Sequence, residues 1–214
     1  MTGQVKSKKR VAEHGEVFTN EREVNAMLDL VKQETERIDS RFLEPACGNG
    51  NFLIEILRRK LEVVKARYKK SQWEYEKNGL MAVMSVYGVD IMPDNVEECI
   101  ERLFDLFFDY YKRLFKKAIK EDYLDIVKFV LSKNILCGDA LSMKASTGTP
   151  LVFAEWSFVK GSLVQRRDFM YEQLITIQEN KNKQETIFGE FVDKPIKTYP
   201  LTHYLNLKEN DTND

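Results

Sequence analysis

Residues 43–53 read Leu-Glu-Pro-Ala-Cys-Gly-Asn-Gly-Asn-Phe-Leu, and this stretch decides the expected fold. An apolar start, an acidic residue, a proline and two closely spaced glycines predict a strand that runs into a glycine turn and then a helix. Gly48 and Gly50 carry no Cβ, so a ligand can approach the main chain closely. Glu44 can engage a ligand cation, and the helix from about Phe52 offers free N–H groups at its start. The stretch therefore predicts a nucleotide-type cofactor loop at the carboxyl end of a parallel strand.

The segments on either side alternate between helical and strand patterns. Helical spacing or helix-start signals predict helices from Asn20, from about Asn51 to Asn78 with Gly79 as the stop, from Pro93, over 122–131 and over 166–179. Apolar and β-branched runs predict strands over 41–45, 81–89, 135–137 and 151–158. Such alternation predicts right-handed crossovers and an α/β fold, with a doubly wound, mostly parallel sheet covered on both faces.

Composition predicts one sizeable globular domain. The chain has 214 residues, of which 43% are hydrophobic and 31% charged, and its net charge of −1 gives no global basic field for nucleic acid. We expect a flexible basic arm over 1–12, the domain over 13–179, and a C-terminal extension over 180–214 whose end is disordered. The three cysteines have no metal spacing and their odd number disfavours a disulfide framework, so we expect a cytoplasmic protein. We expect no signal peptide and no membrane span.

Two further acids follow predicted strands. Asp90 ends the run Tyr87-Gly88-Val89-Asp90-Ile91, where one carboxylate can accept hydrogen bonds from both hydroxyls of a ribose. The alternative is that Asp90 only caps the next helix. Asp139 follows Gly138 after the strand over 135–137 and could accept a hydrogen bond from an adenine amino group. The alternative there is a carboxylate that stabilises its own turn.

One more segment, His14-Gly15-Glu16-Val17-Phe18-Thr19-Asn20, precedes the glycine loop. With it, four segments between residues 14 and 141 follow in an order that resembles the adenine-specific (N6) DNA methyltransferases, in particular the methylase subunit of restriction–modification systems. Those proteins usually read Gly-x-x-Phe/Tyr-Thr-Pro at the first segment, and this chain has Asn20 in place of the proline.

The resemblance implies a Rossmann-like methyltransferase sheet, S-adenosylmethionine as cofactor and DNA as substrate. It also implies a set of cofactor-binding residues at the matching positions, namely Phe18, Thr19, Glu44, Ala46, Gly48, Gly50, Asp90, Ile91, Asp139 and Ala140.

The family's catalytic Asn/Asp-Pro-Pro-Tyr/Phe motif is missing, since no two of the five prolines are adjacent. The segment expected to carry it runs from Pro150 to Phe158. There Glu155 or Ser157 could accept the target amine, and Trp156 or Phe158 could stack on a flipped base. The alternative is that these four side chains belong to the strand's packing.

The remaining sequence leaves the substrate and partners open. Lysines and arginines cluster over 6–10, 58–70 and 160–167, either as contacts to DNA or as solvated surface. Recognition of DNA would need a separate subunit or domain, and we expect neither a metal site nor membrane contact. Alternatives to an active DNA methyltransferase are a catalytically inactive cofactor-binding subunit, an enzyme completed by a partner, and methyl transfer to RNA or a small molecule. The oligomeric state stays undetermined.

Overall fold

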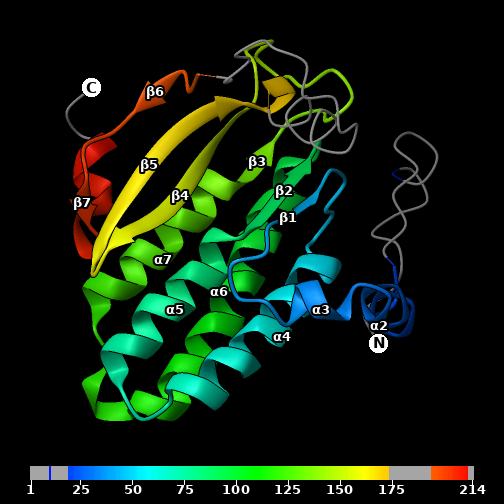
Figure 1. Cartoon of the computed structure of the whole chain (residues 1–214). Coiled ribbons are helices and arrows are strands. Elements are labelled where there is room, and N and C mark those ends of the chain that lie inside the picture. The colour runs from blue at the N-terminus through cyan, green and yellow to red at the C-terminus, as the bar shows by residue number, and fades with distance from the viewer. Residues whose placement is uncertain (1–9, 11–18, 174–193, 212–214) are drawn as a thin grey trace, which may run out of the picture.

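The computed structural model describes residues 10, 19–173 and 194–211. The helices of these ranges are α2 (Glu21–Asp29), α3 (Lys32–Thr35), α4 (Asn51–Tyr68), α5 (Gln72–Met84), α6 (Pro93–Phe115), α7 (Glu121–Asn134) and the 3-10 helices η1 (Lys116–Ala118) and η2 (Tyr204–Asp211). The strands are β1 (Phe42–Glu44), β2 (Val86–Asp90), β3 (Ile135–Cys137), β4 (Val152–Lys160), β5 (Leu163–Met170), β6 (Lys197–Thr198) and β7 (Thr202–His203). In Figure 1 the long helices α4 to α7 gather below the strands.

The strands form two separate sheets, which makes the expected fold class wrong. β1, β2 and β3 form a three-stranded parallel sheet in that order. β4 and β5 form an antiparallel hairpin, and β6 and β7 both pair with β5 in the same four-stranded sheet. The chain therefore combines a short parallel sheet with an antiparallel one, and it does not have a doubly wound, mostly parallel sheet.

The segment after residue 163 explains this difference. It was expected to be helical from Arg166, but it forms β5, whose buried side chains alternate as Val164, Arg166 and Asp168. Two of these inward residues are charged and neutralise each other, because the Arg166 guanidinium donates to both Asp168 carboxylate oxygens at 2.8 and 2.9 Å. Every second side chain of this strand is buried, but because two of these side chains are charged, the alternation does not appear in a hydrophobicity pattern. The turn at Gly161, with φ of +58°, folds β5 back on β4.

The single helix expected from Asn51 to Asn78 is also wrong, since two helices occupy that stretch. α4 ends at Tyr68, and Ser71 caps α5 by accepting a hydrogen bond from the Glu74 N–H. Gly79 lies inside α5, where an added Cβ would be 3.2 Å from the Phe107 ring, so the missing side chain leaves room for this ring of α6. The strand expected from residue 81 begins only at 86, because 81–84 complete α5.

Other local predictions are confirmed. Asn20 caps α2, and its side-chain oxygen accepts a hydrogen bond from the Glu23 N–H at 3.0 Å. Pro93 occupies the first turn of α6, the strand predicted over 41–45 is β1 at Phe42–Glu44, and the strand predicted over 135–137 is β3. At these positions the capping residues in the sequence predicted the helix starts correctly, and the short apolar runs predicted the strands correctly.

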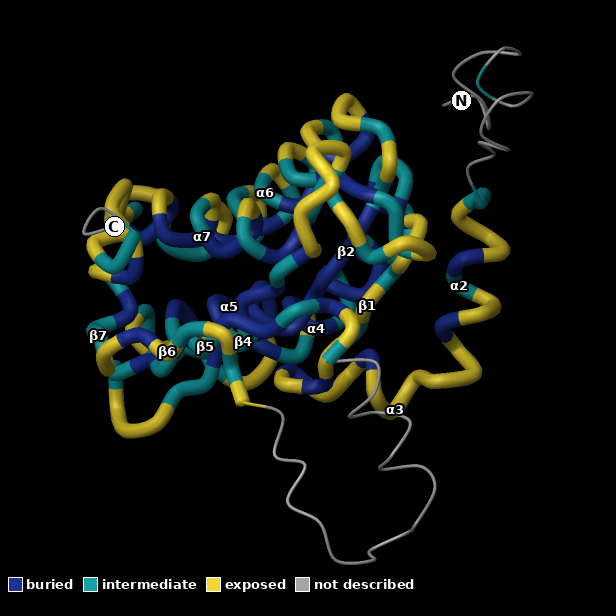
Figure 2. The backbone as a smooth tube through the Cα atoms, turned by 90° about the horizontal axis from the view of Figure 1, so that it is seen from above, coloured by how far each residue is buried: buried dark blue, intermediate teal, exposed yellow. Residues whose placement is uncertain are grey.

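The strand β2 lies between two hydrophobic clusters. Val86 belongs to the main core, which α4, α5, α6 and α7 fill with apolar side chains. Tyr87 and Val89 pack instead with Phe153 of β4 and Tyr171, which follows β5. In Figure 2 the buried positions follow β2 and the facing sides of the helices. The antiparallel sheet thus covers part of the parallel one.

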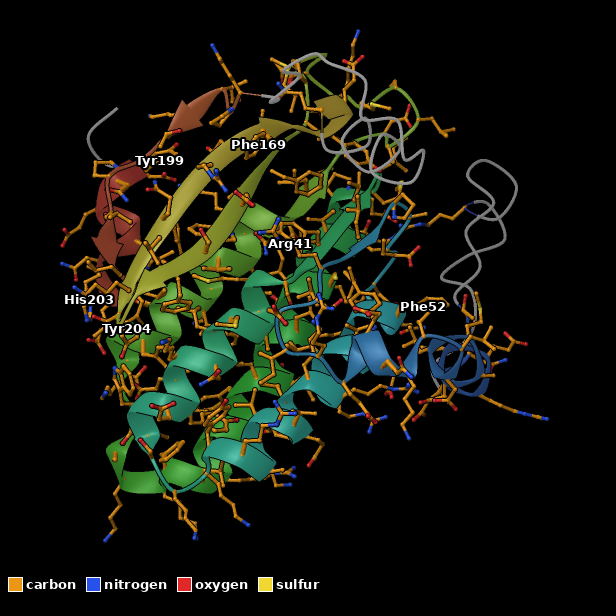
Figure 3. The ribbon with its side chains drawn as sticks, in the orientation of Figure 1. Arg41, Phe52, Phe169, Tyr199, His203 and Tyr204 are labelled. Atoms are coloured by element: carbon orange, nitrogen blue, oxygen red, sulfur yellow. The ribbon has the colours of Figure 1, made fainter. Side chains whose placement is uncertain are left out.

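The C-terminal segment 194–211 closes the opposite side of the molecule from the glycine turn. Figure 3 shows Tyr199, His203 and Tyr204 on that side, far from Phe52. The buried Glu76 carboxylate accepts hydrogen bonds from the hydroxyl groups of Tyr204 at 3.0 Å and Tyr111 at 2.7 Å. The segment therefore docks through a satisfied polar contact as well as through the core.

The Lys60 side chain of α4 is fully buried. Four oxygens lie within hydrogen-bond distance of its Nζ and share its N–H donors: the backbone carbonyls of Arg37, Ile38 and Ser40 and, at 2.8 Å, the Ser85 hydroxyl. Burial lowers the pKa of Lys60 to about 7. This side chain therefore links the residues just before β1 to Ser85, the residue just before β2.

None of the helices within the described ranges has the length and apolar character required to cross a bilayer.

Candidate functional site

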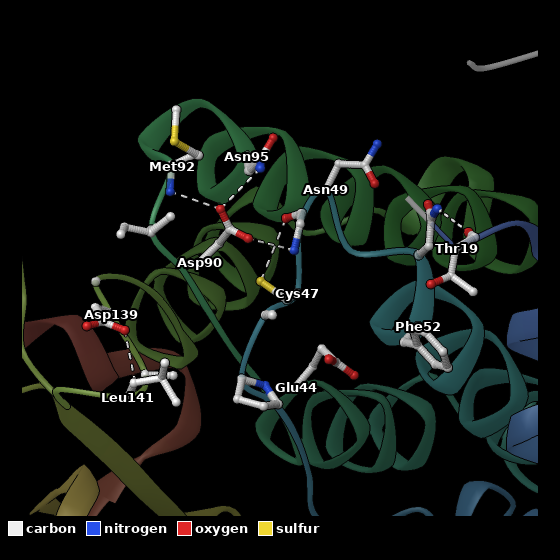
Figure 4. A pocket seen from close by; sticks show the side chains of 17 residues that line it. Thr19, Glu44, Cys47, Asn49, Phe52, Asp90, Met92, Asn95, Asp139 and Leu141 are labelled. Atoms are coloured by element: carbon white, nitrogen blue, oxygen red, sulfur yellow. Dashed lines mark hydrogen bonds between the residues drawn. The ribbon is translucent and has the colours of Figure 1, made fainter. Parts of the chain in front are cut away.

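A cleft of about 540 Å³ opens at the carboxyl ends of the three parallel strands (Figure 4). Parallel strands end at the same edge of a sheet, so residues that follow them in sequence meet there. The side chains and backbone that line the cleft come from the end of each strand and from the starts of three helices, α2, α4 and α6. They are Thr19, Glu44, Pro45, Ala46, Cys47, Gly48, Asn49, Asn51, Phe52, Asp90, Ile91, Met92, Asn95, Gly138, Asp139, Ala140 and Leu141.

Most of the predicted cofactor residues come together in this lining. They are Thr19, Glu44, Ala46, Gly48, Asp90, Ile91, Asp139 and Ala140. Gly50 does not line the cleft; it caps α4 in the left-handed region, with φ of +89°. Phe18 lies outside the described residues.

Asp90 braces the glycine turn against α6. One carboxylate oxygen, Oδ2, accepts the Gly48 N–H at 2.9 Å. The other, Oδ1, accepts the Met92 N–H at 2.9 Å and the Asn95 side-chain amide at 3.1 Å. Asp90 therefore does stabilise the start of the following helix, and it also holds the turn through Gly48. Since a carboxylate has about four acceptor positions, these three bonds leave room for one from a ligand.

Asp139 stabilises its own turn. Its carboxylate accepts the backbone N–H groups of Leu141 at 2.9 Å and Ser142 at 3.2 Å. The hydrogen bonds from Ser142 and Leu141 lower the pKa of Asp139, so this partly exposed side chain is ionised at neutral pH. It faces the cleft across from Asp90 as a carboxylate with acceptor positions still available.

Glu44 supplies the third carboxylate. Burial raises the pKa of Glu44, and the backbone hydrogen bond from Ala46 opposes that rise. The described residues that line the cleft include three carboxylates but no Lys, Arg or His. The lining is therefore acidic, and it suits a ligand that carries positive charge and no phosphate.

The start of α4 offers backbone donors to the same cleft. Its N-cap is Gly50, which has no side chain to accept a hydrogen bond from the first turn. Asn51 and Phe52 are the first two residues of the helix, and both line the cleft. The positive end of the helix dipole lies at this point, so the first turn of α4 could hold a carboxylate.

The four candidate catalytic residues lie on β4, and none of them lines the cleft. The Glu155 carboxylate accepts hydrogen bonds from Arg41 and Arg167, each at 2.8 Å. The indole N–H of Trp156, a residue only 5% exposed, donates to the Asn134 side-chain oxygen at 2.9 Å.

The other two β4 candidates are also placed by the antiparallel sheet. Ser157 pairs with Gln165 of β5, and Phe158 packs against the core with the Lys77 ammonium 5.6 Å from the centre of its ring. All four side chains therefore take part in packing or in surface ion pairs, away from the cleft.

Several lining residues were absent from the prediction. They are Pro45, Cys47, Asn49, Asn51, Phe52, Met92, Asn95, Gly138 and Leu141. Most are chain neighbours of predicted residues, so the strand-end rule extended by two or three positions would have found them. Leu141 and Ile91 are 93% and 53% exposed, and they form an apolar rim on which a flat ring could pack.

No protein-family model, no curated protein and no solved structure matches this chain. Across the ranges that the structure describes, no group of three or more His, Cys, Asp or Glu side chains could hold a metal ion. Any functional conclusion therefore depends on the geometry of the cleft.

Proposed function

We propose that the cleft binds S-adenosylmethionine and that the chain is a methyltransferase-like protein with an adenine amine of DNA as methyl acceptor. The observation that carries this proposal is the meeting of three strand-end carboxylates, Glu44, Asp90 and Asp139, in a cleft whose described lining has no basic side chain. Dinucleotides and nucleoside triphosphates carry phosphates, which such a lining repels. A nucleoside with a positively charged amino-acid end suits it.

The residues present fit the parts of this cofactor. Asp90 has acceptor capacity left for a ribose hydroxyl, and Ile91 and Leu141 offer apolar surface for a base. Glu44 can pair with an ammonium group, while the first turn of α4 can hold a carboxylate. When bound, S-adenosylmethionine supplies a methyl group on a positively charged sulfur, which an amine can accept by direct displacement. The residues of this chain would bind and orient the two reactants, which itself accounts for much of a rate enhancement.

A second candidate is a cofactor-binding subunit that performs no methyl transfer by itself. The engagement of the β4 residues favours it: Glu155 is paired with two arginines and Trp156 is bonded to Asn134, so neither is available to a substrate amine in the cleft. An acceptor for the amine would then come from a partner chain, as would the recognition of DNA. The two candidates share the cofactor and differ in turnover.

Calorimetric titration with S-adenosylmethionine, S-adenosylhomocysteine and ATP tests the shared proposal. We expect micromolar dissociation constants for the first two and no binding of ATP. Glu44→Gln should weaken S-adenosylmethionine binding, whereas Glu97→Gln, an exposed residue of α6 outside the cleft lining, should not. Failure of the wild-type chain to bind S-adenosylmethionine, or equal binding of ATP, would reject the proposal.

Transfer of a radioactive methyl group to unmethylated DNA separates the two candidates. Radioactive label that stays in the DNA after the protein has been removed identifies an active enzyme. Cofactor binding without label in DNA identifies the cofactor-binding subunit, and restoration of label on addition of a partner chain would show where the missing acceptor lies.

A further inference from the structure

Two side chains of α6 that do not line the cleft form hydrogen bonds with Asn49, the middle residue of the glycine turn. Arg102 donates from Nη1 to the backbone carbonyl of Asn49 at 2.6 Å. The Asn49 side-chain amide donates to Glu98 Oε1 at 2.9 Å. Glu98 and Arg102 are four residues apart on one helix, so they lie on the same face and grip Asn49 at two points.

The same guanidinium group reaches the lip of the cleft through one intermediate residue. Arg102 Nη1 also donates to the Asn51 side-chain oxygen at 3.0 Å. The Asn51 side-chain amide donates in turn to the Thr19 carbonyl at 2.8 Å, as Figure 4 shows. Asn49, Asn51 and Thr19 all line the cleft, whereas Arg102 does not.

The turn needs such support because of its glycines. Gly48 and Gly50 both have positive φ, at +51° and +89°, and glycine loses more conformational freedom on ordering than any other residue. Asp90 holds the turn only at Gly48, on the β2 side. Arg102 holds its other half at Asn49 and Asn51, and links it to Thr19 on a separate segment.

We infer that Arg102 is a positioning residue that pre-orders the glycine turn and the Thr19 lip for the cofactor, without touching the cofactor. This inference rests on the proposed function for the identity of the ligand. Ordering the turn in the free protein means that binding does not incur that entropy cost, so Arg102 acts on affinity through pre-organisation. The two consecutive hydrogen bonds, from Arg102 to Asn51 and from Asn51 to Thr19, further predict that substitutions of Arg102 and Asn51 have coupled effects on affinity.

The test is a double-mutant cycle on S-adenosylmethionine binding. Arg102→Gln should raise the dissociation constant about tenfold, and the Arg102→Gln, Asn51→Ala double variant should lose less affinity than the two single losses combined. The matched control is Arg113→Gln, which removes the same charge from the same helix at a residue that pairs only at 3.7 Å with the exposed Asp109. The control should bind within twofold of wild type. Strict additivity, or an Arg102→Gln variant that binds as the wild type does, would overturn the inference.

Amide hydrogen exchange of the free protein gives a readout that does not depend on the cofactor. Arg102→Gln should speed exchange in peptides that cover 19–20 and 48–52, and leave those of α7 unchanged. If Arg102→Gln does not fold, Arg102→Lys and Asn51→Ala provide the same comparison, and unchanged exchange at residues 19–20 in Asn51→Ala would refute the link. If the wild-type chain does not bind S-adenosylmethionine, the proposed function fails, while the exchange data still decide whether Arg102 orders the turn.

Discussion

Gly50→Ala tests the packing of the glycine turn on α6. An ideal Cβ at Gly50 would lie 2.6 Å from the Cys99 Sγ and 3.5 Å from the Cys99 Cβ. The residue also has φ of +89°, a region that costs an L-residue about 1–2 kcal/mol. Overpacking a well-packed site adds about 1–3 kcal/mol. Gly50→Ala should therefore lower the free energy of unfolding by about 2–5 kcal/mol.

Gly148→Ala separates the two contributions. Gly148 has φ of +82°, close to that of Gly50, but a Cβ added there has no heavy atom within 4 Å. This variant should lose only the backbone cost, about 1–2 kcal/mol. Urea unfolding followed by circular dichroism measures both variants, and the difference between them is the steric contribution of Cys99.

Cys99→Ala in the Gly50→Ala background should restore part of the loss, because the Sγ that meets the new methyl group is gone. The coupling between the two substitutions should be about 1–3 kcal/mol, within the range for residues in contact. If Gly50→Ala costs no more than Gly148→Ala, or if the two substitutions are additive, the close approach of the turn to α6 is refuted.

Three other changes test separate parts of the structure. Asp90→Asn changes the carboxylate that accepts the Gly48 and Met92 N–H groups, so it should lower the free energy of unfolding by ~1–3 kcal/mol and weaken S-adenosylmethionine binding. Wild-type affinity in calorimetry would mean that Asp90 only stabilises the glycine turn and the start of α6. Trp156→Phe leaves the Asn134 oxygen without its indole donor, which should cost ~1–3 kcal/mol in urea unfolding but leave cofactor binding unchanged, and a change in affinity would contradict the separation of β4 from the cleft. The pKa of Lys60 falls from 10.5 in the unfolded chain to about 7 in the folded protein, so the unfolded state binds more protons between these values and stability from this group rises with pH across that window. Lys60→Met should remove that rise, which amounts to at most about 1.4 kcal/mol per pH unit, and parallel urea titrations of both proteins at pH 7 and 9 would disprove this if their difference stayed constant.

The cleft could be anticipated because its determinants are local in sequence. Each parallel strand is short and has an acidic residue at its carboxyl end: Glu44 and Asp90 are the last residues of β1 and β2, and Asp139 comes two residues after β3. Since parallel strands end at one edge, the strand-end positions meet however the rest of the chain folds. That rule needs only the directions of β1, β2 and β3, and seven of the eight predicted residues in the lining follow from it; the eighth, Thr19, lies just before α2.

The fold class could not be predicted in the same way, because it depends on pairings between distant segments. β4 is an apolar run that suits a parallel or an antiparallel sheet equally, and its partner β5 buries Arg166 and Asp168. Those charges are tolerated because the guanidinium also donates to Asp211 at 2.5 Å and lies 4.2 Å from the centre of the Tyr199 ring, both from the C-terminal segment. Hydrophobic periodicity cannot register an inward face whose charged side chains are satisfied by each other and by residues more than 30 positions away.

Asp90 shows why the strand-end acids indicate fold and function together. Capping the next helix and binding a ribose appear as alternatives when only the sequence is considered. In the structure Asp90 already accepts hydrogen bonds from Gly48, Met92 and Asn95, and these bonds hold its carboxylate in one orientation in the cleft lining. A carboxylate with no such partners would be free to rotate, and ordering it would weaken ligand binding. The structural role of Asp90 is therefore a condition for the ligand-binding role, and evidence for the first does not argue against the second.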